Sequence, residues 1–271
     1  IAPDGTMYGT WRFNNNIFDQ RAFRFTTDGT FTDFDRLLNA SGALSNTFFG
    51  TATNDYAFCR TANLGYAYRV SDGVFLDLPV IRATPGLATG FGSNANNWFV
   101  GVSPSDNGSR ATLWRLNGSG QFEATNLGLP ANPIPDATST ARGVNENGVV
   151  VGWTGTFTNN DAFIWTEADG MRTLPRLDPA RSHFAYDVNN DGLVVGYRAA
   201  SSSSVTAVIW DSATDEAADL LPRVTNPAGW DSLLDAQFIT SDGRIMGRGV
   251  LNGLNTAYLL KEAFGQLWSY R

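Results

Sequence analysis

The only histidine of the chain, His183, lies in a polar stretch with Arg181 and Tyr186 nearby. Histidine is the side chain whose ordinary pKa lies closest to neutrality, so it is the most common general base. With Tyr186 beside it and Arg181 to neutralise a carboxylate, His183 could catalyse β-elimination on a uronic-acid polymer. The competing interpretation is a loop histidine without a chemical role, which is the more common situation.

Carboxylates offer two other kinds of chemistry. Asp187 or Asp178 could join His183 and a serine in a Ser-His-Asp triad, but the chain has no Gly-x-Ser-x-Gly turn to present that serine. Asp136, Asp187 and Asp235 begin or line the inner strands expected for three consecutive repeats, where two of them could act as the acid and base of a glycosidase. The competing interpretation is structural: these aspartates could accept hydrogen bonds from backbone amides of the loops.

Ligand binding without catalysis is the third possibility. Trp230 lies in a long polar segment, unlike most of the eight tryptophans, which recur at one strand position and are therefore expected in the core. We predict that Trp230 is an exposed platform for a ligand. The other predicted ligand-binding residues are polar and lie in long connections or inner strands: Arg142, Asp235, Gln237, Asp136 and Arg223.

Metal and cofactor sites have little support in the sequence. Cys59 is the only cysteine, so neither an intrachain disulfide nor a multi-cysteine metal site can form, and one histidine excludes a multi-histidine site. The Asn/Asp-Gly turns lack the ligand count of a calcium loop. We therefore predict no metal and no cofactor.

Charge and hydropathy also limit the partners. The net charge is −7, and Lys and Arg form no runs, so nucleic acid and anionic membrane surfaces lack an electrostatic attraction. No apolar run approaches the ~20 residues of a spanning helix. The chain begins with Ile1 rather than Met, so we expect a preceding segment to have been removed.

These residues must be positioned by a repeat that is visible by eye. Two apolar residues followed by glycine recur along the chain, and after each copy an alanine opens a short apolar run. The glycine copies are Met7-Tyr8-Gly9, Phe48-Phe49-Gly50, Phe99-Val100-Gly101, Val150-Val151-Gly152, Val194-Val195-Gly196 and Ile245-Met246-Gly247. The alanines are Ala22, Ala67, Ala111, Ala162, Ala207 and Ala257.

Tight turns, mostly Asn/Asp-Gly, and often a Leu-Pro step complete the repeats, which gives four strands, a to d, in about 45 residues. One such sheet cannot bury both faces alone, so we predict an all-β, six-bladed β-propeller of four-stranded antiparallel blades in a single domain. The glycine would end strand b where neighbouring blades approach, and the strand c aromatic would fill the gap between blades. The predicted blades are residues 1–36, 37–82, 83–133, 134–178, 179–226 and 227–271.

The two ends of the repeat differ from the rest. Blade 1 is expected to have almost no strand a, because the chain begins where that strand should end. The stretch from Phe264 to Tyr270 is expected to be strand d of blade 6.

The copy from Val144 to Pro175, VNENGVVVG followed by AFIW and GMRTLP, resembles the HAF repeat of bacterial secreted proteins. The family is named for a His-Ala-Phe tripeptide, and this chain has no histidine before any of its six alanines. The resemblance implies an exported, extracellular or cell-surface bacterial repeat protein and brings no chemistry with it.

The long connections are those between strands d and a and between strands b and c, which share one face of a propeller. We therefore predict a ligand-binding propeller that recognises a glycan or a surface protein at this face. The alternative is a secreted polysaccharide lyase or glycoside hydrolase that uses His183, Tyr186, Arg181 and Asp187.

Overall fold

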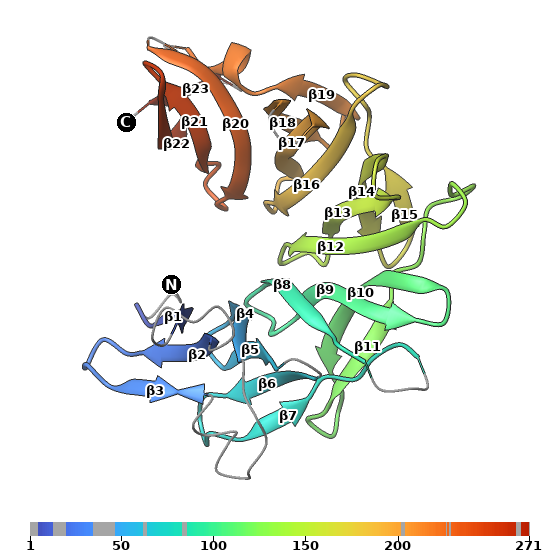
Figure 1. Ribbon diagram of the computed structural model, residues 1–271, viewed down its shortest axis with the longest axis vertical. Helices are drawn as coiled ribbons and strands as arrows, with labels where there is room; N and C mark the ends of the chain where they lie inside the picture. Colours follow the sequence, from blue (N-terminus) through green and yellow to red (C-terminus); the bar gives the residue numbers. More distant parts are fainter. Residues whose placement is uncertain are drawn as a thin grey trace. The chain divides into compact units, whose positions relative to one another are not determined.

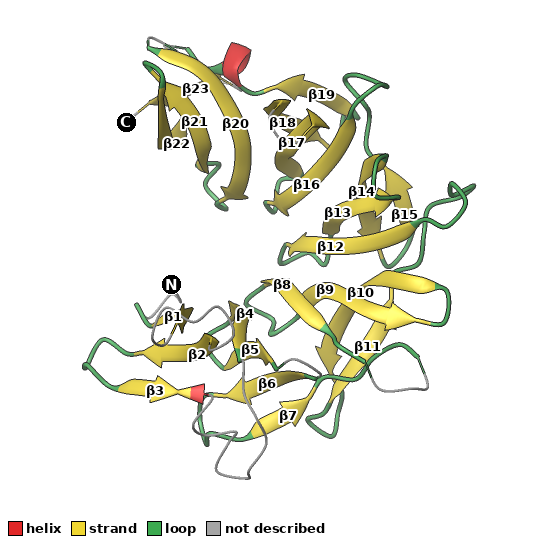
Figure 2. Cartoon of the chain, in the orientation of Figure 1, coloured by secondary structure: helices red, strands yellow, loops and turns green. Residues whose placement is uncertain are grey.

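The structure is a computed structural model that describes residues 5–12, 20–34, 47–61, 64–82, 86–201, 204–225, 227, 229–263 and 267–270. It is all-β, as predicted, with six antiparallel sheets (Figure 1). The short 3-10 helix η1 (Leu221–Arg223) follows the fifth sheet (Figure 2). No helix in the described ranges is long and apolar enough to cross a membrane.

Each sheet is a meander in which strands pair in chain order. Sheet 1 holds β1 (Met7–Arg12), β2 (Gln20–Phe25) and β3 (Phe31–Asp33); sheet 2 holds β4 (Phe48–Ala52), β5 (Tyr56–Arg60), β6 (Gly65–Arg69) and β7 (Phe75–Asp77); sheet 3 holds β8 (Thr89–Ser93), β9 (Phe99–Ser105), β10 (Gly108–Leu116) and β11 (Phe122–Asn126). Sheet 4 holds β12 (Thr138–Val144), β13 (Val150–Gly155), β14 (Asn160–Thr166) and β15 (Gly170–Thr173); sheet 5 holds β16 (Ser182–Val188), β17 (Leu193–Ser201), β18 (Ser204–Asp211) and β19 (Glu216–Asp219); sheet 6 holds β20 (Trp230–Ile239), β21 (Ile245–Leu251), β22 (Leu254–Ala263) and β23 (Leu267–Tyr270).

The chain divides into two compact units, residues 1–127 with sheets 1 to 3 and residues 128–271 with sheets 4 to 6. Within the second unit the first strands lie next to one another, β12 against β16 and β16 against β20 (Figure 1). Each predicted blade range contains one of the six sheets. Whether all six form a single domain stays a prediction.

The ends of the repeat show a three-stranded first sheet and a strand β23 paired with β22 in the last. The residues where strand a of blade 1 was expected to end, 1–4, lie outside the described ranges, as do residues 264–266 of the predicted last strand. From 267 onward, that last strand has the position predicted for it.

The recurrent glycine has a different reason from the one expected. Gly152, Gly196 and Gly247 lie inside strand b, not at its end, opposite a bulge in strand a of the same sheet. A Cβ on Gly196 would lie 1.9 Å from the carbonyl oxygen of Phe184. Cβ atoms on Gly152 and Gly247 would each lie 2.0 Å from a carbonyl oxygen of strand a in their own sheets. The close approach of these three glycines is therefore within one sheet, and no side chain fits there. A Cβ on Gly50, in contrast, would lie 2.5 Å from the carbonyl oxygen of Gly90 in the next sheet, the kind of approach that was expected.

Sheet 2 corrects one anchor of the predicted repeat. Phe48-Phe49-Gly50 was assigned to strand b, but it lies in β4, the first strand of its sheet. Gly50 is the extra residue of the bulge in that strand, opposite Phe58 and Cys59. The sequence pattern was misleading because glycine suits both a bulge and a position beneath a bulge.

Aromatic residues of strand c pack between neighbouring sheets, as predicted. Trp114 and Trp210 are fully buried, and each indole N–H donates to the carbonyl oxygen of the proline in the preceding sheet's Leu-Pro step. The acceptors are Pro79 at 2.8 Å and Pro175 at 2.9 Å. These bonds explain why a Leu-Pro step and a strand c tryptophan occur together.

Candidate functional site

Residues 128–271 contain a hollow of about 660 Å³. It lies where β16 begins and β17 ends, next to the connection between β13 and β14. At this end of sheet 5 lie the connection that leads into its strand a and the connection between its strands b and c. The lining residues come from sheets 4, 5 and 6: Phe157, Thr158, Ala180, Ser182, Phe184, Tyr186, Tyr197, Ala199, Ala200, Val205, Asp235 and Arg248.

Strand alternation sorts the side chains of β16. Ser182, Phe184 and Tyr186 line the hollow, whereas His183 and Ala185 are buried on the other side of the strand. Tyr186 is the extra residue of the bulge between Ala185 and Asp187. Bulges commonly change the direction of a side chain. Because of this bulge, Tyr186 lines the hollow, whereas the next residue, Asp187, contacts the backbone of β20.

Aromatic rings form the floor of the hollow. The rings of Phe184 and Tyr197, which are partners across β16 and β17, stack with centroids 4.8 Å apart. Tyr186 lies edge-on to Tyr197 at 5.3 Å, and Trp153 from β13 lies 5.4 Å from Phe184. Such a floor offers apolar faces to a ligand and hydroxyl groups at its edge.

An ion pair from sheet 6 also lines the hollow. Asp235 on β20 accepts from Nε of Arg248 on β21 at 2.9 Å, and the Nη2 of the same guanidinium also binds this carboxylate. Its other oxygen accepts from the backbone N–H of Arg248 at 3.1 Å and from Gln237 Nε2 at 3.2 Å. The Asp235 carboxylate is buried, whereas the Arg248 side chain is 68% exposed.

A second guanidinium lies behind the aromatic floor. Arg142, the bulge residue of β12, stands over the rings of Tyr186 at 4.9 Å and Trp153 at 5.6 Å. Burial lowers its pKa, although an arginine remains charged at neutral pH. Burial, followed by the nearby Tyr186 hydroxyl, raises the pKa of Tyr197, so that this phenol stays protonated and can donate a hydrogen bond.

The rim carries a fully solvent-exposed aromatic side chain, Phe157. It lies in the turn between β13 and β14, which Gly155 begins with a φ of 149°. A Cβ at Gly155 would lie 2.1 Å from the carbonyl oxygen of Asn159, so glycine is required there. Thr156 N–H donates to the same carbonyl at 3.0 Å, which closes the turn and presents Phe157 at its tip.

The sequence of this chain matches a known protein family. Residues 94–241, more than half of the chain, match the family described as "Protein of unknown function (DUF3466)". The chain belongs to the DUF3466 family. A comparison with curated proteins found no match.

Solved structures show which fold this DUF3466 chain has. The putative TolB from Agrobacterium tumefaciens matches with a TM-score of 0.52 at 10% identity, over 76% of this chain and 73% of that one. TolB from Acinetobacter baumannii matches with a TM-score of 0.51 at 12% identity, over 98% of this chain and 65% of that one. An oligogalacturonate lyase in complex with manganese matches with a TM-score of 0.50 at 12% identity, over 96% and 83%. At these identities the likeness shows the fold alone, which is that of a β-propeller, as predicted.

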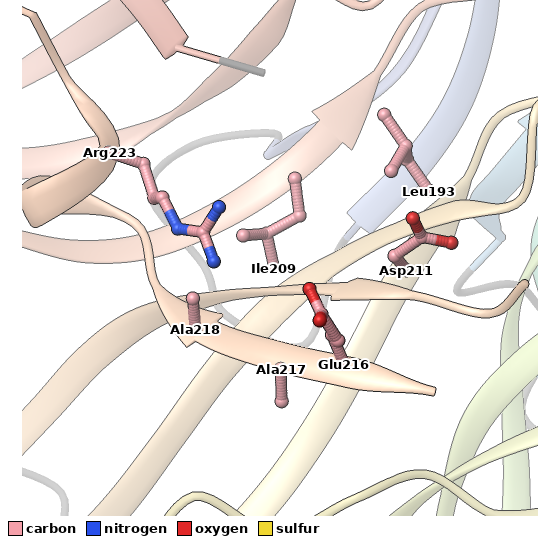
Figure 3. Close-up of a pocket in the computed structure, with 7 residues that line it drawn as sticks. All are labelled: Leu193, Ile209, Asp211, Glu216, Ala217, Ala218 and Arg223. Atoms are coloured by element: carbon pink, nitrogen blue, oxygen red, sulfur yellow. The ribbon is translucent and has the colours of Figure 1, made fainter. Parts of the chain in front are cut away.

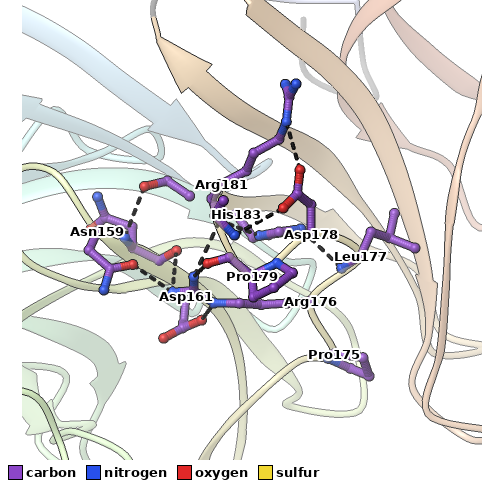
Figure 4. A network of polar contacts seen from close by, with 12 residues as sticks. Asn159, Asp161, Pro175, Arg176, Leu177, Asp178, Pro179, Arg181 and His183 are labelled. Carbon is purple, nitrogen blue, oxygen red and sulfur yellow. Dashed lines mark hydrogen bonds and ion pairs between the residues drawn. The ribbon is translucent and has the colours of Figure 1, made fainter.

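Arg176 joins the two connections that frame the hollow of the DUF3466 chain (Figure 4). Its guanidinium binds the carboxylate of Asp161, donates to Asn159 Oδ1 at 2.7 Å and donates to the carbonyl oxygen of Pro179 at 2.9 Å. One side chain thus holds the d–a connection before β16 against the b–c connection before β14. Arg181 extends the frame, because it binds Asp178 at 2.9 Å and Ser204 Oγ at 3.2 Å.

His183 belongs to this frame rather than to the lining of the hollow. The residue is 1% exposed, and the centroid of its ring lies 6.4 Å from that of Trp210. The Nε2 atom accepts from the backbone N–H of Leu177 at 3.2 Å, and Nδ1 lies 2.9 Å from the carbonyl oxygen of Arg181 (Figure 4). These partners fit a neutral imidazole that carries its proton on Nδ1. Burial lowers the pKa of His183 below the ordinary 6.5.

Replacing His183 with glutamine is expected to lower the free energy of unfolding by about 2 kcal/mol at pH 7.5, because glutamine can replace only one of the two ring contacts. The folded pKa is lowered, so the unfolded chain takes up the proton first as pH falls below 6.5. The stability difference between wild type and H183Q should therefore shrink as pH falls through this range. Urea unfolding at pH 7.5, 6.5 and 5.5 measures it; a difference that widens at low pH would contradict the neutral imidazole.

The remaining predicted residues lie in several places. Trp230 begins β20 and packs edge-on against Tyr258, with ring centroids 5.9 Å apart. Asp136 is exposed and adopts a φ of 58° in the turn before β12. Arg223 lines a separate pocket of about 30 Å³ beside Ile209 and Glu216 (Figure 3). Of the ten predicted site residues, Tyr186 and Asp235 line the hollow, while Arg142 and Gln237 contact those two.

Asp187 lies beside the hollow but faces the other way. Its carboxylate accepts from the backbone N–H of Val188 and from that of Ile239 on β20, both at 2.9 Å. Gly143 on β12 abuts it, and a Cβ there would lie 2.8 Å from Asp187 Cα. Asp187 therefore ties the first strands of sheets 5 and 6 and contacts that of sheet 4. Burial raises the pKa of Asp187 to about 6.

Four residues important to the hollow were not singled out from the sequence: Trp153, Phe157, Phe184 and Arg248. One signal was available for Phe157, a lone aromatic residue in the polar segment from Gly155 to Asp161. Alternation over Ser182 to Tyr186 also separates Phe184 from His183. No such signal exists for Arg248, because its partner Asp235 lies on another strand.

Proposed function

We propose that this chain is an exported saccharide-binding β-propeller, and that the hollow in residues 128–271 is its binding site. The observation that carries the proposal is the aromatic floor of Phe184 and Tyr197 with the exposed Phe157 at the rim. The apolar faces of sugar rings pack on aromatic rings, while their hydroxyl groups need polar partners at the edge. The Tyr186 and Tyr197 hydroxyls and Arg248 supply those partners.

The size and exposure of the hollow support a ligand. A volume of about 660 Å³ lies within the range of small-molecule sites. Phe157 is fully exposed where it lines the hollow, so its ring is accessible to a ligand there. A protein partner would need a larger apolar surface than one ring at a rim.

The observations favour binding over the lyase alternative. Elimination by His183 requires an accessible ring nitrogen, and both nitrogens of this buried ring already contact the loop. One structure with the same fold is an oligogalacturonate lyase, but 12% identity carries no activity to this chain. Export is proposed on the resemblance to HAF repeats.

Replacing Phe157 with alanine is expected to weaken saccharide binding about tenfold, the loss of one aromatic contact, without changing stability. Leu254→Ala is the matched control, since Leu254 is an exposed apolar residue at the β21–β22 hairpin that does not line the hollow. A glycan array followed by calorimetry with the best binder provides the measurement. If F157A binds as tightly as L254A, the hollow is not the site; if no saccharide binds wild type, the proposed function is wrong.

A further inference from the structure

We propose that the hollow selects saccharides that carry an acidic group, and that Arg248 with the hydroxyls of Tyr186 and Tyr197 binds this group. The inference rests on the proposed function and specifies its ligand class. It starts from an asymmetry in the ion pair of sheet 6, where the carboxylate is buried and the guanidinium faces solvent.

The accessible charge of the hollow is positive. Asp235 is 3% exposed, and both its oxygens are occupied by Arg248 and Gln237. Arg248 uses Nε and Nη2 for this carboxylate, and within the described part of the chain its Nη1 makes no hydrogen bond. A ligand in the hollow therefore meets the N–H groups of Nη1 and the open face of the guanidinium. Arginine is well suited to bind carboxylates and sulfates through such donors.

The tyrosine hydroxyls add donors beside the guanidinium. The Tyr186 and Tyr197 rings lie edge-on with centroids 5.3 Å apart, and both side chains line the hollow together with Arg248. A phenol is protonated at neutral pH, so the Tyr197 hydroxyl can donate a hydrogen bond to a ligand. Arg142 over the Tyr186 ring adds positive charge on the far side of the floor. A neutral sugar would leave this concentration of donors without an anionic partner.

Other arginines around the hollow are already paired. Arg176 binds Asp161, Arg181 binds Asp178, and Arg198 binds Asp219 at 2.8 Å. Each of these pairs exposes both partners to a similar degree, unlike the pair of Arg248 with Asp235. Arg248 is therefore the cation in this region best placed to receive a ligand, although the whole chain carries a net charge of −7.

Calorimetry with three probes tests the inference: trigalacturonate for a carboxylate, a sulfated carrageenan oligosaccharide for a sulfate ester, and neutral cellotriose. We expect wild type to bind one acidic probe at least tenfold more tightly than cellotriose, and the stronger of the two acidic probes identifies the group. Arg248→Gln should lose that preference, so that its affinities for cellotriose and for the acidic probes differ by less than twofold. Arg172→Gln, which breaks the exposed pair with Asp215 outside the hollow, is the matched control and should keep the preference.

Because Arg248 also neutralises Asp235, the folding of R248Q is checked by circular dichroism. If it unfolds, Arg248→Lys and the salt dependence of wild type replace it, since raising NaCl from 50 to 500 mM should weaken only acidic binding. Equal affinity for cellotriose and the acidic probes, or an unchanged preference in R248Q, overturns this inference and leaves saccharide binding standing. Absence of binding by all three probes and by a glycan array overturns the proposed function as well.

Discussion

Replacing Gly196 with alanine is expected to lower the free energy of unfolding by at least about 3 kcal/mol. The added Cβ would lie 1.9 Å from the carbonyl oxygen of Phe184 and 3.0 Å from Ala185 Cα. Both contacts are backbone atoms of a hydrogen-bonded strand, so β16 or β17 must move. Because Phe184 and Tyr186 lie on β16, saccharide binding should be lost with stability.

Gly118→Ala is the matched control for this substitution. No atom lies within 4 Å of a Cβ built at Gly118, and its φ is not positive. The same change should therefore alter the free energy of unfolding by less than about 0.5 kcal/mol, as expected for an unconstrained surface position. Urea denaturation of both variants measures the contrast. If G196A and G118A unfold at the same urea concentration, the explanation of the recurrent glycine is wrong.

The number of sheets could be predicted from the sequence because turns and apolar runs repeat. Asn145-Glu146-Asn147-Gly148 and Asn189-Asn190-Asp191-Gly192 both form the tight turn between strands a and b, as predicted. The register in sheet 2 could not be predicted, because a two-residue apolar step before a glycine fits strand a with a bulge as well as strand b. Bulges depend on pairing between strands, which local sequence does not determine.

The candidate site was only partly predictable for the same reason. Arg142 and Gln237 were placed on inner strands and Tyr186 directly after a connection, and the structure shows that each is the extra residue of a bulge. Their direction follows from that bulge, so the sequence could indicate the strand but not what each side chain contacts. His183 shows a second reason for the limited prediction. Its residue type suggested a catalytic base, but in the folded chain both ring nitrogens form hydrogen bonds with the backbone.

The second large effect concerns Asp187 and depends on pH. Its pKa is raised to about 6 in the folded chain, against 3.8 for the ordinary group, because burial disfavours the carboxylate more than the N–H groups of Val188 and Ile239 favour it. Below pH 3.8 both folded and unfolded chains are protonated, so the group costs nothing. Between pH 3.8 and 6 the unfolded chain ionises first, and above 6 ionised Asp187 lowers the free energy of unfolding by about 3 kcal/mol.

Asp187→Asn removes this titration while keeping the size of the side chain. The amide can accept from only one of the two N–H groups, a cost that does not change with pH. The free energy of unfolding of D187N minus that of wild type should therefore rise by about 2.5 kcal/mol as pH increases from 4 to 7.5, a range that urea unfolding covers. In the control Asp242→Asn the sign is reversed, because the Thr240 hydroxyl lowers the pKa of Asp242 and its ionised form is the stabilising one. A difference for D187N that is constant with pH, or that falls, would show that the carboxylate linking β16 to β20 is not held against its ionisation.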